Sequence, residues 1–375
     1  MSDKSTPPES GGKENAMKER WSKERAWEYW NKLPWLVGCN YVPSQAPVLS
    51  MWKDDTLEEM MPTLESELEL AASIGFNTAR IWFPFNSWYH EREICLDRID
   101  RVLGIFAKHG ILVMPVLFND CVSFGKPASI EIPKPQPGHG SYDKGYHGGH
   151  KNSPHVVPPK DAKGWILWDE EEYRPVCEQY IRDLFTRFGH DRRIVIWDMW
   201  NEPGNSRRGG MSIPYLTRAF EVARECDPEQ PLTAGAWAYP DTFGADPKVD
   251  VSPIQRLAID LSDIVSFHDY EPFWKVKNIV NKLEEEGRPM ANTEWLHRIW
   301  DNTIFDQLPL YHDKKIASYN WGLVAGFSQH YLPWEWLKAS RPDLDYSKWQ
   351  HDLFHEDHAP YDPAEIELIK KLAGK

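Results

Sequence analysis

Short runs of apolar residues alternate along this chain with longer stretches in which apolar residues recur at helical spacing. The short runs indicate buried strands, because parallel strands covered by helices on both faces show continuous rather than alternating hydrophobicity. Eight runs fit this description, at residues 35–43, 78–83, 111–120, 194–203, 231–237, 264–270, 289–295 and 317–326. Helical patterns lie between them, for example at 56–75, 96–110 and 169–189. The alternation predicts repeated strand–helix units and a parallel sheet.

Eight such units without a break predict an α/β fold, a single-domain (β/α)8 TIM barrel over residues 21–375. The 375 residues are enough, because such barrels take about 250 residues and can exceed 400 with insertions. An open, doubly wound sheet is the rival. It would place a glycine-rich phosphate loop after the first strand, and GCNYVPSQA at 38–46 is not such a loop.

Two segments depart from the strand–helix rhythm. Residues 1–20 are polar and rich in Ser, Pro, Gly and Glu, so we expect them to be disordered. Residues 120–167 separate the third strand from its helix and are rich in Gly, Pro and His. A loop of this length is usually functional or disordered. Because it leaves the C-terminal end of a strand, we expect this insertion to lie over the active-site face of the barrel.

Composition narrows the choice of partner. The formal net charge is −14 and no stretch concentrates Lys or Arg, which argues against nucleic acid and anionic membranes as partners. The chain contains 19 Trp, 15 Tyr and 15 Phe. Flat amphipathic rings of this kind either pack the core or stack on flat apolar faces such as those of sugars. The five cysteines show no CxxC spacing, so we expect neither a disulfide framework nor a zinc ribbon.

The first 20 residues lack the apolar region of a signal peptide, and no apolar run is long enough to span a bilayer. We therefore expect a cytoplasmic location, unless a signal was removed from the chain. No cofactor or metal is expected.

Two glutamates carry the candidate chemistry. Glu202 follows the fourth strand and Glu294 lies in the seventh, so they should face each other across the mouth of a barrel. Glycoside hydrolysis needs one carboxylic acid to protonate the leaving oxygen and one carboxylate to attack or to activate water. The acid needs a pKa raised by burial or by a nearby negative charge. The nucleophile must stay ionised, and Arg80 and Tyr270 are suitable donors.

Other polar and aromatic residues also stand at strand ends, where a barrel binds its substrate. We expect substrate-binding roles for Arg80, Asn119, Asp120, Asn201, Trp237, His268, Tyr270 and Trp321. Asp198, inside the fourth strand, is expected to point into the barrel or to support Arg80.

Three motifs carry a resemblance to a known family. They are WDMWNEPG around Glu202, HDY at 268–270 and TEW around Glu294. Over residues 30–340 the chain resembles clan A of the glycoside hydrolases, and within it family 5, the cellulase and mannanase family. The resemblance implies a retaining glycoside hydrolase that cleaves β-linked oligo- or polysaccharides by double displacement. Glu202 would be the acid/base and Glu294 the nucleophile.

The resemblance also implies individual roles. Asn201 would bind the sugar 2-hydroxyl, Arg80 and Tyr270 would hold Glu294, His268 would line the subsite of the attacked sugar, and Trp321 would be the platform beneath it. The chain departs from the family pattern after the third strand, where a His is common and this chain has LFNDC. We expect Asn119 or Asp120 to take over that contact.

Two other functions compete with this one. A catalytically silent carbohydrate-binding barrel would keep the tryptophans and lose a carboxylate, yet both glutamates are present. A metal-dependent barrel hydrolase would use the histidines of the insertion, although glycine-rich spacing offers no rigid ligand face. Those residues are His139, His147, His150 and His155, with Asp143 beside them. Trp334 and Trp336, after the eighth strand, either extend a substrate cleft or pack locally.

Overall fold

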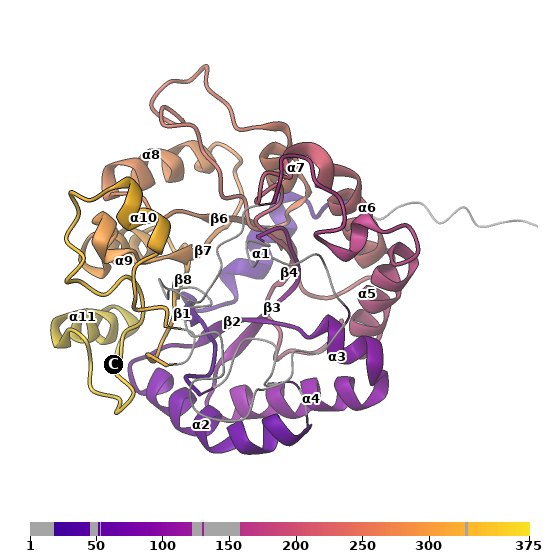
Figure 1. Ribbon diagram of the computed structural model, residues 1–375, viewed down its shortest axis with the longest axis horizontal. Helices are drawn as coiled ribbons and strands as arrows, with labels where there is room; N and C mark the ends of the chain where they lie inside the picture. The colour runs from indigo at the N-terminus through magenta and orange to yellow at the C-terminus, as the bar shows by residue number, and fades with distance from the viewer. Residues whose placement is uncertain (1–18, 46–51, 53, 122–129, 131–157, 327–328) are drawn as a thin grey trace, which may run out of the picture.

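Eight parallel strands ringed by helices form the body of the protein in the computed structural model (Figure 1). The structure describes residues 19–45, 52, 54–121, 130, 158–326 and 329–375. The strands are β1 (Val37–Asn40), β2 (Thr78–Trp82), β3 (Leu112–Asn119), β4 (Trp197–Asn201), β5 (Leu232–Ala234), β6 (Val265–His268), β7 (Met290–Trp295) and β8 (Ala317–Trp321). They are ordered β5-β4-β3-β2-β1-β8-β7-β6. The predicted (β/α)8 barrel is confirmed.

The barrel closes between β5 and β6 through a single parallel bridge, Ala236 with Phe267. The backbone N–H of Ala236 donates to the Ser266 carbonyl at 3.2 Å, and that of His268 donates to the Ala236 carbonyl at 2.8 Å. Gly235 precedes this bridge, and a Cβ there would lie 2.5 Å from His268 Nε2. Only glycine therefore lets the His268 ring pack against the β5 backbone.

The helices follow the predicted order with shifted ends. They are α1 (Lys23–Asn31), α2 (Asp54–Ser73), α3 (Phe85–His90), α4 (Arg92–Lys108), α5 (Arg174–Phe188), α6 (Ile213–Glu225), α7 (Pro253–Leu261), α8 (Phe273–Glu284), α9 (Ile304–Asp313), α10 (Glu335–Ser340) and α11 (Pro363–Ala373). Gly75 (φ 95°) and Gly110 (φ 72°) follow α2 and α4. Their left-handed backbone stops both helices, as expected of glycine after a C-cap.

Two hydrophobic layers hold the barrel together. Outward-facing strand residues such as Ala79 and Ile81 pack against the helices in the larger core. A smaller cluster fills the N-terminal end of the barrel, where Ala26 and Trp30 of α1 close it. The Trp30 indole N–H donates to the Lys315 carbonyl at 3.1 Å, which satisfies the one polar atom of a ring that is 2% exposed. This seal leaves the opposite end of the barrel for a functional site.

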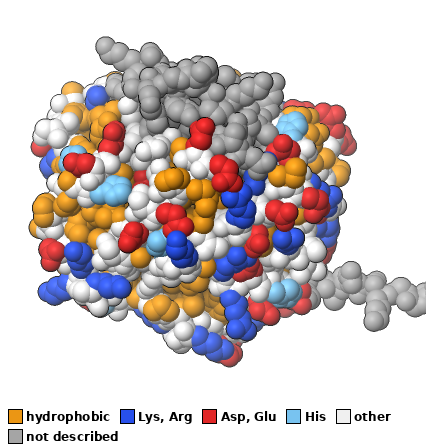
Figure 2. All heavy atoms as spheres, turned by 90° about the horizontal axis from the view of Figure 1, so that it is seen from below, with side chains coloured by type: hydrophobic (Ala, Val, Ile, Leu, Met, Phe, Trp, Pro, Cys, Tyr) orange, Lys and Arg blue, Asp and Glu red, His pale blue; other side chains and the backbone are white. Residues whose placement is uncertain are grey.

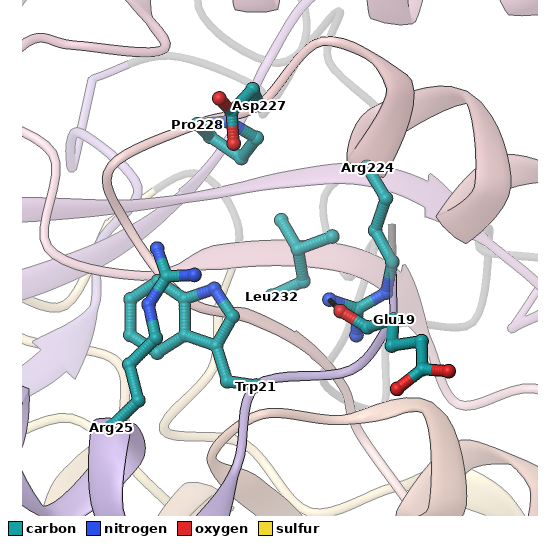
Figure 3. A pocket seen from close by; sticks show the side chains of 7 residues that line it. All are labelled: Glu19, Trp21, Arg25, Arg224, Asp227, Pro228 and Leu232. Carbon is teal, nitrogen blue, oxygen red and sulfur yellow. Dashed lines mark hydrogen bonds between the residues drawn. The ribbon is translucent and has the colours of Figure 1, made fainter. Parts of the chain in front are cut away.

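A small pocket lies at the sealed end, where Leu232 begins β5 (Figure 3). Its volume is about 30 Å³, which suits a few water molecules at most. The Arg25 guanidinium lies over the Trp21 ring, 4.0 Å from its centroid. Arg224 donates to the Asp263 carboxylate at 3.0 Å. The Asp263 carboxylate also accepts from the Trp21 backbone N–H at 2.8 Å, which joins the N-terminal segment to the barrel at the end remote from Glu202 and Glu294.

The described part of the chain begins at residue 19, inside the segment 1–20. Arg20, which we expected to be disordered with residues 1–20, donates from Nε to the Ser262 carbonyl at 2.7 Å. Most of the predicted insertion at 120–167 lies outside the described residues, including His139, His147, His150 and His155.

In the described part of the chain, no helix combines the length and apolar character needed to cross a membrane. Figure 2 shows one face, on which acidic, basic and hydrophobic side chains are interspersed.

Candidate active site

The C-terminal ends of β2, β4, β6 and β7 bring their polar side chains together at the open end of the barrel. Glu294 reaches this site through a register irregularity. Asn292 of β7 faces outward, since its Nδ2 donates to the Tyr311 hydroxyl of α9 at 2.7 Å. Strict alternation would place Glu294 on that same side. The β6–β7 register shifts between Phe267 and His268, and a shift of this kind re-aims a side chain.

Arg80 and Tyr270 hold the Glu294 carboxylate. Arg80 Nη1 donates to Oε1 at 2.7 Å and the Tyr270 hydroxyl donates to Oε2 at 2.9 Å. Arg80 is fully buried, and its guanidinium also donates to Asp198 at 2.9 Å, to Asn40 at 2.8 Å and to Asn201 at 2.6 Å. A guanidinium with this many acceptors has one orientation, so it fixes the carboxylate in place.

Glu202 has a different environment. It directly follows β4 with a left-handed backbone (φ 46°), an uncommon conformation for a non-glycine residue and one that clusters at functional sites. Its Oε1 lies 3.0 Å from His268 Nδ1, and its Oε2 accepts a hydrogen bond from the Asn205 amide. In the described part of the chain, no Arg or Lys forms an ion pair with it. Its carboxyl group is therefore held by neutral donors.

Burial raises the pKa of both glutamates. Glu202 is 8% exposed and Glu294 is 5% exposed. For Glu294, the positive charge of Arg80 and its hydrogen bond oppose this rise in pKa. Burial also lowers the pKa of His268 to about 4, so the imidazole is neutral at pH 7. Arg80 contacts Glu294 and not Glu202, so it favours the ionised form of Glu294.

The two carboxyl groups are close. One oxygen of Glu202, one oxygen of Glu294 and one ring nitrogen of His268 all lie within 4.8 Å of one another. This triad is also the cluster of described residues whose spacing could accommodate a metal ion. Within this triad, Glu294 already forms an ion pair with Arg80 at 2.7 Å.

The other predicted site residues divide into two groups. Asn201 joins the group formed by Arg80 and the two glutamates. Its Oδ1 accepts from Arg80, and its Nδ2 donates to Asn119 Oδ1 at 2.8 Å. Asn119 is thus one contact away from Arg80. Trp321 is 4% exposed and meets Trp82 edge-on at 5.3 Å. The Trp237 indole N–H donates to the Pro203 carbonyl at 3.2 Å, directly after Glu202.

Asp120 does not join them. Its side chain is fully buried, Oδ2 accepts from the Gly204 N–H at 2.6 Å and Oδ1 lies 3.2 Å from Arg208 Nε. Arg208 in turn binds Asp169 through two hydrogen bonds of 2.7 and 2.9 Å. The Asp120 oxygens thus face the Gly204 backbone and Arg208, which shape the turn after Glu202, and a contact of Asp120 with a sugar stays a prediction.

Some side chains of the site were not predicted. Asn40 pairs with Arg80 in the β1–β2 ladder and also bonds its guanidinium. The one feature of the sequence that could have indicated Asn40 is its position as a polar residue at the C-terminal end of an apolar strand. Asn205 and Gln255 hold Glu202 and the Pro203 carbonyl, and their roles depend on the shape of the loops. Asp198, expected to support Arg80, accepts its hydrogen bond.

The segment after β8 supports the site from behind. Arg298, after β7, binds Glu365 of α11 through two hydrogen bonds of 2.8 and 2.6 Å. It also donates to the backbone carbonyls of His351 and Asp352. The His351 ring lies beside Tyr270, with ring centroids 5.5 Å apart. A buried ion pair thus holds the chain that backs the tyrosine bound to Glu294.

Replacing Arg298 with Leu should lower the free energy of unfolding by about 3–5 kcal/mol, because Glu365 would remain buried without a partner. Urea denaturation followed by circular dichroism measures the change. The exposed pair Lys32–Glu28, with side chains 69% and 71% exposed, provides the control, and Lys32→Ala should leave the unfolding curve unchanged. Equal curves for Arg298→Leu and the unmodified protein would contradict this role.

A barrel with a buried carboxylate pair at the C-terminal ends of its strands is the arrangement of barrel glycoside hydrolases. A family model described as cellulase (glycosyl hydrolase family 5) matches residues 45–321. The chain therefore belongs to glycosyl hydrolase family 5, as the resemblance in its motifs predicted.

Individual relatives are distant. The probable mannan endo-1,4-beta-mannosidase F of Aspergillus flavus is 23% identical over 193 residues, which are 49% of this chain and 35% of that protein. A beta-glucuronidase of Paenibacillus borealis is 24% identical over 117 residues, 31% of this chain and 19% of that protein. The chain thus matches about a third or less of the length of these relatives.

Solved structures share the fold. An exo-beta-1,4-mannosidase from Opitutaceae bacterium strain TAV5 superposes with a TM-score of 0.55 at 16% identity, covering 90% of this chain and 59% of the other. An endo-beta-1,4-mannanase from Thermotoga petrophila gives a TM-score of 0.53 at 15% identity, covering 90% and 76%.

Proposed function

We propose that this protein is a retaining β-glycosidase. The observation that carries the proposal is the contrast between two neighbouring glutamates. Glu294 receives hydrogen bonds from a buried guanidinium and a tyrosine hydroxyl, whereas the donors to Glu202 among the described residues are neutral. The contrast favours an ionised Glu294 and a protonated Glu202, which are the states that double displacement requires at the start of the reaction.

The spacing of the pair supports retention. Retaining enzymes hold their carboxyl groups about 5–5.5 Å apart, whereas inverting enzymes need about 6.5–9.5 Å to admit a water molecule. Oxygens of Glu202 and Glu294 lie within 4.8 Å of each other. This upper bound on the separation of one oxygen of each carboxyl group lies nearer the retaining range than the inverting range.

In the first step, Glu294 attacks the anomeric carbon and Glu202 gives its proton to the departing glycosidic oxygen. The bond to that oxygen breaks as the ester to Glu294 forms. In the second step, Glu202 takes a proton from water while the water oxygen displaces Glu294 from the same carbon. Both glutamates return to their initial states, and the two inversions leave the anomeric configuration unchanged.

Four further residues would bind the sugar. Asn201, held by Arg80 and Asn119 beside Glu202, would bind the 2-hydroxyl. His268, with its neutral ring between the glutamates, would line the subsite of the attacked sugar. Trp321 would form the platform under that ring and Trp237 one wall of the cleft. The names of the relatives make β-1,4-linked mannosides the first substrates to test.

The proposal is tested with 4-nitrophenyl β-glycosides and with β-1,4-linked oligosaccharides of mannose, glucose and xylose. We expect hydrolysis of at least one series, with the β-anomer as the first product in ¹H NMR spectra. EDTA should leave the rate unchanged, because no step uses a metal. An α-anomer as first product would contradict retention, and loss of activity in EDTA would favour the metal-dependent alternative.

A further inference from the structure

The segment after β8 carries two stacked tryptophans at the open end of the barrel. Trp334 directly precedes α10 and Trp336 lies in its first turn. Their ring centroids are 5.5 Å apart and their planes differ by 17°. Trp336 is 42% exposed, so one large aromatic side chain is presented to solvent with another behind it.

Trp334 connects this stack to the proposed catalytic pair. Its ring meets that of Tyr270 edge-on, with centroids 5.6 Å apart and planes at 85°. The Tyr270 hydroxyl donates to Glu294 Oε2 at 2.9 Å. Tyr270, Trp334 and Trp336 therefore form a continuous line of rings that leads from Glu294 to the surface.

Trp334 is held in place on several sides. Its ring lies 4.9 Å from that of His297 and 5.7 Å from that of His351, and its backbone N–H donates to Gln350 Oε1 at 2.9 Å. A ring fixed before binding loses little conformational entropy when a ligand arrives. The stack is thus a preformed surface, and its outer member remains available for contact.

We propose that Trp336, backed by Trp334, is the platform of an additional sugar subsite that holds a further pyranose ring of a β-linked oligosaccharide. The proposal rests on the proposed function, since an oligosaccharide bound at Glu294 would extend toward Trp336 along the contacts of Tyr270 with Trp334 and of Trp334 with Trp336. The apolar C–H face of the ring would pack on the exposed indole face. Trp336 would then set the preference for longer substrates without touching the reacting bond.

Trp336→Ala tests the subsite, and Trp27→Ala is the matched control. Trp27 is 37% exposed and lies on α1, at the sealed end of the barrel. We expect Trp336→Ala to lower kcat/KM for β-1,4-mannopentaose by roughly five- to tenfold, mainly through KM. The value for 4-nitrophenyl β-mannoside, which carries one sugar ring, should stay within about twofold. Trp336→Phe should restore most of the kcat/KM lost for the pentasaccharide. Trp27→Ala should leave kcat/KM unchanged for both substrates.

The outcomes separate the two proposals. If the wild-type protein hydrolyses the corresponding glucose or xylose series instead, the same comparison is made in that series. An unchanged kcat/KM for the pentasaccharide in Trp336→Ala would overturn the subsite alone, as would an equal loss on the monosaccharide glycoside. No hydrolysis of any series by the wild-type protein would overturn the proposed function and the subsite with it.

Discussion

Glu294→Ala is expected to lower kcat by at least about 10⁴-fold, because the covalent intermediate can no longer form. Arg80 and Tyr270 would remain in place, so the vacated volume keeps donors arranged for an anion. Azide should enter that volume, attack the anomeric carbon in place of the carboxylate and restore part of the rate with an activated aryl glycoside. The product should be the α-glycosyl azide, because only one inversion takes place.

Steady-state kinetics with and without azide, followed by NMR of the product, measure this effect. Glu28→Ala serves as the control, since that carboxylate lies on α1 and its side chain is 71% exposed. It should retain the wild-type rate. A near-normal kcat for Glu294→Ala, or a rescued product with the β configuration, would contradict the assignment of the nucleophile.

Glu202→Ala should slow hydrolysis by about 10²–10⁴-fold for substrates with poor leaving groups. The loss should be small for a 2,4-dinitrophenyl glycoside in the first step, because that leaving group departs without a proton. Azide should now give the β-glycosyl azide, since Glu294 still forms the ester. This product has the opposite configuration from that of Glu294→Ala and identifies each glutamate separately.

The pH profile gives a second measure of Glu202. Burial raises the pKa of this carboxyl group, so Glu202 should stay protonated above the ordinary range of a glutamate. As pH rises through that pKa, Glu202 loses its proton and kcat/KM should fall. In Glu202→Ala the alkaline fall should disappear, while the acidic limb, set by protonation of Glu294, persists. An unchanged alkaline limb would show that another group supplies the proton.

The barrel could be predicted because each strand and helix leaves a local pattern. The eight apolar runs correspond to the eight strands, and Gly75 and Gly110 stop helices where a C-cap glycine was expected. The strand ends are less predictable from the runs. Of the predicted run at 231–237, only Leu232–Ala234 form the strand β5. Beyond them, Gly235 accommodates the His268 ring, and the barrel closes through one bridge at Ala236.

The site could be predicted only as far as strand position determines it. Glu202, Glu294, Arg80, His268 and Tyr270 lie together because parallel strands end on one face. Asp120 also ends a strand, but its oxygens bind Arg208 and the Gly204 N–H. Whether a residue at a strand end turns inward or supports a loop depends on partners far away in sequence.

The support behind the site shows the same limit. Arg298 and Glu365 are separated by 67 positions, and nothing in the local pattern around either residue indicates the other. The line from Tyr270 through Trp334 to Trp336 likewise joins segments that follow different strands. Such contacts arise from packing of the whole chain, so they become visible only in the folded structure.

Trapping of the glycosyl–enzyme intermediate tests the central claim most directly. A 2-deoxy-2-fluoro β-glycoside with a good leaving group, from the series that the enzyme hydrolyses, should form the ester quickly and release it slowly. Peptide mass spectrometry should then locate one added fluorosugar on Glu294, and Glu294→Gln should remain unlabelled. A label on Glu202 or on any other residue, or no label while the reagent is hydrolysed with inversion, would contradict the account.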